Sequence, residues 1–108
     1  MLKKFLLLAT ISLGTFNLWA ETNQKCIDLS NALQQKQIKR QDLQQKNITF
    51  NDELMRIKKD PSLDAIMKNE IKLLLEGFIE SNTIAIKNLE EEMDQIKEIA
   101  AGLACHEI

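Results

Sequence analysis

The 108-residue chain contains no tyrosine, one tryptophan, one proline, one histidine and two cysteines. Because no aromatic residues alternate with its positive charges, the composition excludes a nucleic-acid site of the stacking type. The single histidine, His106, follows Cys105, and two potential ligands do not make a metal site. A Cys-His pair at this position would also lack a third group to orient it for nucleophilic catalysis. We therefore expect no enzyme, no cofactor and no metal centre.

Residues 1–20 have the three regions of a signal peptide in the right order. Two lysines precede an apolar run that ends at Trp19, and Ala20 then precedes a polar segment. The run contains Asn17 and is shorter than the roughly 20 residues of a spanning helix, so an uncleaved membrane anchor is the less favoured alternative. We predict cleavage after Ala20, which leaves residues 21–108 as one small helical domain, periplasmic or secreted.

The two cysteines, Cys26 and Cys105, lie near the two ends of this mature chain. In an exported protein, a disulfide is the expected state of such a pair. We predict an intramolecular bond that joins the ends of the domain. The alternative is a pair of intermolecular bonds in a dimer.

Apolar residues in both halves of the mature chain recur at helical spacing. The first half has a heptad seam, with steps of three and four, formed by Cys26, Leu29, Leu33, Lys36, Arg40, Leu43, Asn47, Phe50, Leu54 and Ile57. The second half has a stripe close to an eleven-residue repeat, formed by Ile71, Leu74, Phe78, Asn82, Ala85, Leu89, Met93, Ile96, Ala100 and Leu103. The sequence predicts an all-α coiled-coil protein, either an antiparallel helical hairpin or a small three-helix bundle with one long C-terminal helix.

The only proline marks the boundary between these halves. Asp60 has the character of a helix N-cap, and Pro61 that of a first helical residue. If the arms on both sides were unbroken helices, they would measure about 50 Å and about 64 Å. The cysteines would then miss each other by about 15 Å, whereas a disulfide needs Cα atoms within about 7 Å.

Two changes would close this gap. A break at residues 47–52, where two β-branched residues lie between asparagines, would lengthen the first arm. A glycine C-cap at Gly102 would let the following residues turn back toward the first arm. We therefore expect three helices, over residues 23–46, 51–59 and 61–101.

Charge divides the mature chain at the same boundary. Residues 21–59 carry eight Lys or Arg and five Asp or Glu, whereas residues 60–108 carry four and eleven. Chance variation between two solvated faces is one explanation of this difference. The other is attraction between antiparallel arms. If residue i lies near 131 − i, as the cysteine pair implies, Lys36 and Arg40 face an acidic run comprising Glu90, Glu91, Glu92 and Asp94. The alternative is that both cations extend to solvent independently.

The middle of the long C-terminal helix is apolar beyond one stripe. Leu75, Ile79 and Ile86 widen the predicted inner face, and Leu73 and Ile84 point nearly the other way. Gly77 and Ser81 form a small-residue pair four apart that would permit close approach of another backbone, although such pairs are weak evidence outside a membrane.

One packed neighbour would leave Leu75, Ile79 and Ile86 exposed, unless the short second helix covers them. We expect these three residues to bind a protein partner, which makes the chain an exported helical interaction module of the adaptor, chaperone-like or inhibitor type. The alternative is a structural envelope protein that buries this strip against copies of itself. Membrane binding is disfavoured because the helix is acidic.

Overall fold

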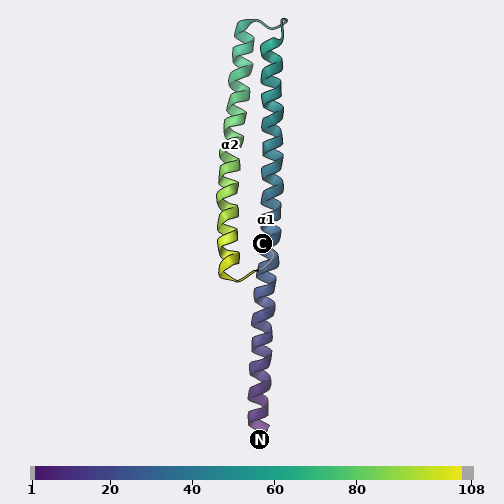
Figure 1. The fold of residues 1–108 in the computed structure, drawn as a ribbon, viewed down its shortest axis with the longest axis vertical. Helices are drawn as coiled ribbons and strands as arrows, with labels where there is room; N and C mark the ends of the chain where they lie inside the picture. Colours follow the sequence, from purple (N-terminus) through teal and green to yellow (C-terminus); the bar gives the residue numbers. More distant parts are fainter. Residues whose placement is uncertain (1, 106–108) are drawn as a thin grey trace. The chain divides into compact units, whose positions relative to one another are not determined.

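The computed structural model describes the backbone of residues 2–105 and the side chains of residues 20–105. These residues form two α-helices, α1 (Leu2–Lys59) and α2 (Ala65–Gly102), and no strand (Figure 1). The chain divides into two compact units. One unit combines the part through Gln34 with the part from Gln95 onward, and the other is Gln35–Asp94. The predicted all-α class is confirmed.

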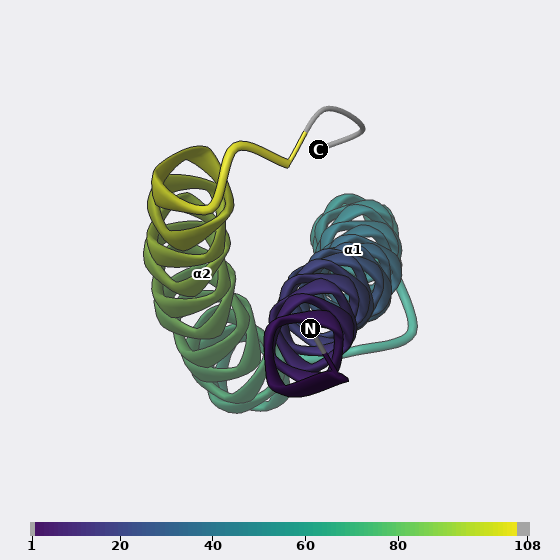
Figure 2. The same ribbon diagram turned by 90° about the horizontal axis from the view of Figure 1, so that it is seen from below.

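The unit Gln35–Asp94 is an antiparallel hairpin made of the end of α1, a turn and the start of α2. A view along the helices shows a short connection between them (Figure 2). The expected three-helix arrangement is wrong, because α1 continues without interruption through residues 47–52. The antiparallel hairpin, which was the other predicted arrangement, is confirmed.

Two polar side chains within residues 47–52, those of Asn47 and Thr49, donate hydrogen bonds that are compatible with a helical backbone. The Thr49 hydroxyl donates to the carbonyl of Gln45, one turn earlier, at 3.1 Å. The Asn47 amide donates across the hairpin to the carbonyl of Ile79 at 3.5 Å and to the hydroxyl of Thr83 at 3.3 Å. Asparagine and threonine weaken a helix when they bond to the backbone in non-helical conformations. Here both instead bond within a continuous helix or to the neighbouring one.

The turn between the helices is longer than the sequence predicts. Asp60 does not cap α2, because its carboxylate accepts hydrogen bonds from the backbone N–H and the hydroxyl of Ser62 at 2.9 and 2.6 Å. These bonds hold the pKa of Asp60 below its ordinary value. Pro61 lies in this turn and not in the helix. The N-cap is Asp64, whose carboxylate accepts from the N–H of Met67 at 2.8 Å.

At its other end, α2 closes in a Schellman motif. The N–H of Cys105 donates to the carbonyl of Ala100 at 2.9 Å, and that of Ala104 donates to Ala101 at 3.1 Å. The expected glycine C-cap at Gly102 is wrong, because Gly102 is the last helical residue and the left-handed position belongs to Ala104, with φ of 55°. Glycine is the usual residue at this position because it has no Cβ to clash with the carbonyl.

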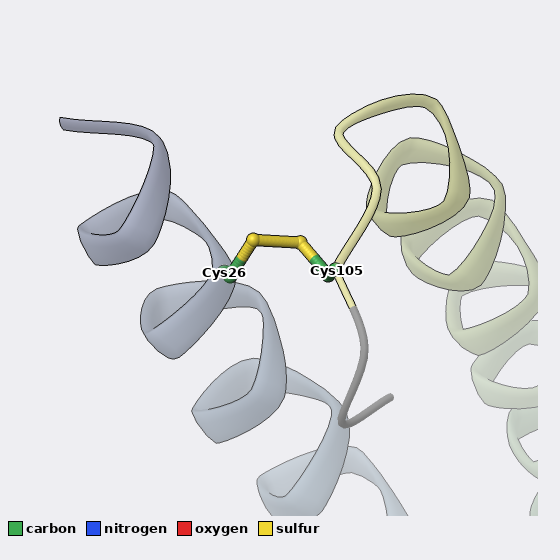
Figure 3. Close-up of a disulfide and its surroundings, with 2 residues drawn as sticks. All are labelled: Cys26 and Cys105. Atoms are coloured by element: carbon green, nitrogen blue, oxygen red, sulfur yellow. A yellow bond between two sulfur atoms is a disulfide. The ribbon is translucent and has the colours of Figure 1, made fainter. Parts of the chain in front are cut away.

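The turn at Ala104 directs Cys105 toward α1 (Figure 3). Cys105 forms a disulfide with Cys26, with Cα atoms 5.7 Å apart, so the predicted intramolecular bond is confirmed. The expected difference in length between the two arms is small in the structure because α2 is shorter than expected. This helix has 38 residues, or about 57 Å, and the segment from Cys26 to Lys59 spans about 51 Å.

The left-handed Ala104 generates a stability prediction. Replacing Ala104 with glycine should raise the free energy of unfolding by about 1 kcal/mol, since glycine adopts this conformation without the Cβ penalty. Ala101→Gly is the matched control: Ala101 is exposed and helical, so the same change should lower stability by up to about 1 kcal/mol. Urea denaturation of the oxidised protein measures both. Equal losses in the two variants would contradict the Schellman geometry.

The disulfide generates a second prediction. Replacing both cysteines with serine should lower the free energy of unfolding by at most about 4.5 kcal/mol, which is the chain-entropy limit for a closed loop of this length. Thermal unfolding followed by helical circular dichroism measures the loss. A non-reducing gel of the wild-type protein that shows chiefly disulfide-linked dimer, or a thiol assay that finds two free cysteines, would exclude the bond.

Candidate functional site

The strip predicted to bind a partner is partly buried in the hairpin. Leu75 is only 9% exposed, and Ile79 and Ile86 are half-buried. The expectation that one neighbouring helix leaves Leu75 uncovered is therefore wrong. The seam predicted for α2 is correct at eight of its ten positions, which are buried or half-buried, and wrong at Leu74 and Phe78, which are 62% and 52% exposed.

Contacts with α1 decide which side of α2 is buried. Asn47 reaches Ile79 and Thr83 on one side of the contact line, and Phe50 stacks on Phe78, with ring centroids 5.6 Å apart, on the other. At 100° per residue, Leu75 lies between these two sides. The seam predicted for α1 needs no such correction, since all ten of its positions are buried or half-buried.

The predicted charged residues meet across the hairpin, although not in the predicted register. Lys36 Nζ lies 2.7 Å from Glu92 Oε2, and Arg40 Nη1 lies 3.8 Å from Glu90 Oε1. The cysteine-based register placed Lys36 opposite residue 95 and Arg40 opposite residue 91. The register differs because Cys105 lies beyond the end of α2, so the disulfide does not mark a helical pairing.

Glu92 is the acidic residue most affected by this contact. The hydrogen bond from Lys36, the charge of Lys36 and the nearby charge of Lys39 together hold the pKa of Glu92 below its ordinary value. Glu91 and Asp94, also predicted to take part, are exposed and form no ion pair within the described residues. Of the predicted acidic run, two residues therefore reach the first helix.

An apolar surface that is more than half exposed begins at Phe78, whose ring also stacks on Phe50, and continues onto the side of α2 that faces away from α1. Its members occupy an arc of about 140° that contains no Lys, Arg, Asp or Glu between residues 73 and 84. We call it the outer face of α2, formed by Leu73, Leu74, Gly77, Phe78, Ser81 and Ile84. The four large side chains are 52–62% exposed. A contiguous exposed apolar surface on a small protein is typical of an interaction site.

Gly77 lies at the centre of the outer face. A Cβ added there would meet no atom within 4 Å, so nothing within the described chain requires glycine at this position. In a helix interior, glycine destabilises by roughly 0.5–1 kcal/mol relative to alanine. The sequence already showed the pair Gly77 and Ser81, but the surrounding face was missed because Leu74 and Phe78 fitted the predicted seam. The absence of charged residues around Gly77 and Ser81 was the sequence signal that would have located this outer face.

Other kinds of site find no support in the described part of the chain. Among residues 20–105, whose side chains the structure describes, no group of three His, Cys, Asp or Glu is placed to hold a metal ion. Within the described part of the chain, no helix is long and apolar enough to cross a membrane. His106 lies outside the described residues, and the signal peptide predicted over residues 1–20 stays a prediction.

The contact between Lys36 and Glu92 generates a third prediction. In a double-mutant cycle, Lys36→Glu and Glu92→Lys should each destabilise the hairpin, and the double variant should recover part of the loss. The Arg40 and Glu90 pair serves as the control, and its coupling should be weaker because its atoms are farther apart. Simple additivity at both pairs would show that the charges are separated by solvent.

The same pair should respond to pH. The lowered pKa of Glu92 stabilises the folded protein above the unfolded pKa of about 4.3, and this contribution disappears as pH falls through the folded pKa. The stability difference between wild type and Glu92→Gln should therefore be largest near neutral pH and shrink in acid. A difference that is constant with pH would contradict the assignment.

No protein-family model, curated protein or solved structure matches this chain. The functional argument is therefore made from the geometry and chemistry of its own residues.

Proposed function

We propose that the protein is an exported, non-enzymatic interaction module that binds an apolar helical segment of a polypeptide on the outer face of α2. The observation that carries this proposal is the exposure of Leu73, Leu74, Phe78 and Ile84 around Gly77. An amphipathic helix recognises such a surface through anchors three, four and seven residues apart. Gly77 would allow the side chains of the bound helix to approach the α2 backbone closely.

The architecture supports a binding role. The exposed side chains all project from α2, which packs against α1 in the hairpin. Just beyond the end of α2, Cys105 is bonded to Cys26. A surface that is ordered before binding loses little conformational entropy on association. The disulfide also agrees with export, because such bonds persist mainly outside the cytoplasm.

Site-specific photo-crosslinking tests this proposal. A photoreactive phenylalanine analogue at Phe78, introduced into the full-length protein in its native cell, should form covalent adducts of higher mass on illumination. The matched control carries the same analogue at Asp94, which is exposed on the same helix but outside the outer face. Adducts at Phe78 and none at Asp94 are expected. If neither Phe78 nor Leu74 gives an adduct, the outer face is not a binding surface.

A further inference from the structure

The charged residues around the outer face of α2 are mostly acidic. Between residues 70 and 91, the helix positions within about 100° of the central glycine include four glutamates and one lysine. They are Glu70, Glu76, Glu80, Lys87 and Glu91, and all five are exposed. Glu70 lies near the centre line of the face, about one turn before its first leucine, and the other four follow one edge. The exposed apolar surface is therefore bordered by negative charge.

Most of this negative charge has no partner within the hairpin. Glu76 lies 3.9 Å from Lys72, one turn earlier on the same helix. Glu70, Glu80 and Glu91 take part in no ion pair within the described residues. The cations of α1 that reach α2 pair with other glutamates. Three carboxylates around the outer face are thus available to the cations of a partner.

These charges disfavour a second copy of α2 as the partner. In an antiparallel pair of outer faces, the acidic edges of the two copies would lie side by side. In a parallel pair, Glu70 would approach its counterpart near the centre line of the contact. Like charges placed together in an interface suppress that pairing. An anionic membrane surface is disfavoured for the same reason.

A partner without charge would also match this surface poorly. Covering the outer face would remove water from Glu70 and Glu80, and a carboxylate that loses water without gaining a partner is destabilised. Lysine or arginine on the flanks of a bound helix would replace that water with charge-assisted hydrogen bonds. The arrangement therefore favours apolar anchors accompanied by positive charge.

We propose that the outer face of α2 binds a cationic amphipathic helix, which has apolar anchors on one side and lysine or arginine beside them. This inference rests on the proposed function and identifies the chemistry of its partner. The face from Leu73 to Ile84 is about 17 Å long, which matches three turns of a bound helix. Cations beyond one end of these turns and along one edge would reach Glu70 and Glu80.

Two synthetic peptides of about 18 residues, long enough to form a helix, test the role of charge. Both place leucines at helical spacing on one face, and their other positions are all lysine in one peptide and all glutamine in the other. The oxidised protein, purified from its native cell, should bind the lysine peptide about tenfold more tightly. Three or four exposed ion pairs, each worth about twofold in affinity, give this ratio. Fluorescence anisotropy of labelled peptides measures it, and added salt should narrow the difference.

Four single variants locate the binding surface. Leu74→Ser removes an apolar anchor and should weaken the binding of both peptides at least about fivefold. Glu80→Lys should weaken the lysine peptide alone by about fivefold, and Lys87→Glu should strengthen its binding by a similar factor. Asp52→Lys is the matched control, because it makes the same change of net charge on α1, and it should alter affinity less than about twofold. All four residues are exposed, so helical circular dichroism should change little.

The native partner gives an independent test. The adduct formed in the native cell through the photoreactive analogue at Phe78 should contain a definable crosslinked segment. Peptide mass mapping of that segment should find apolar residues three and four apart, together with net positive charge.

Three outcomes would overturn this inference. One is the absence of any preference for the lysine peptide. Another is an equal loss of affinity in Glu80→Lys and Asp52→Lys, which would show that overall charge and not the acidic edge attracts the peptide. The third is a crosslinked segment that is neutral or acidic, or that belongs to a second copy of this chain. Each of these leaves the proposed function intact, whereas the absence of any adduct would remove both.

Discussion

The bond between Cys26 and Cys105 is the constraint on which the rest of the structure depends. It joins positions 79 residues apart, so the two arms between them must have nearly equal lengths. The chain meets this requirement without breaking α1. It begins α2 at Ala65, after a turn held by Asp60, and ends it at Gly102 with Ala104 in a left-handed conformation. One alanine therefore has a left-handed conformation, and the first helix is continuous.

A hairpin has one internal interface, and this limits how much apolar surface it can bury. Only six described hydrophobic residues are buried, among them Leu75, Leu89 and Met93. Large apolar side chains on the outer sides of both helices consequently stay in contact with water. In a larger bundle, further helices would cover them.

Polar residues within the interface specify how the helices meet. Asn47 bonds to the backbone and side chain of α2, and Lys36 pairs with Glu92. Apolar contacts alone would tolerate a shift along the helix, because leucine and isoleucine recur on nearly every side of α2 between residues 71 and 86. The polar contacts have fixed geometry, so they distinguish one register from its neighbours.

The sequence by itself determined the features that depend on local pattern. Heptad spacing located the buried side of α1, and cysteine placement identified the disulfide. Tertiary structure decided the rest. The polar residues near Asn47 were consistent with a break, and only the position of α2 shows that the Asn47 amide N–H group donates across the hairpin from a continuous helix. Likewise, helical period did not select the buried side in the middle of α2, because apolar residues lie on several sides of the helix there. The packing of Phe50 and Asn47 made that selection, covering Leu75 and leaving Leu74 exposed.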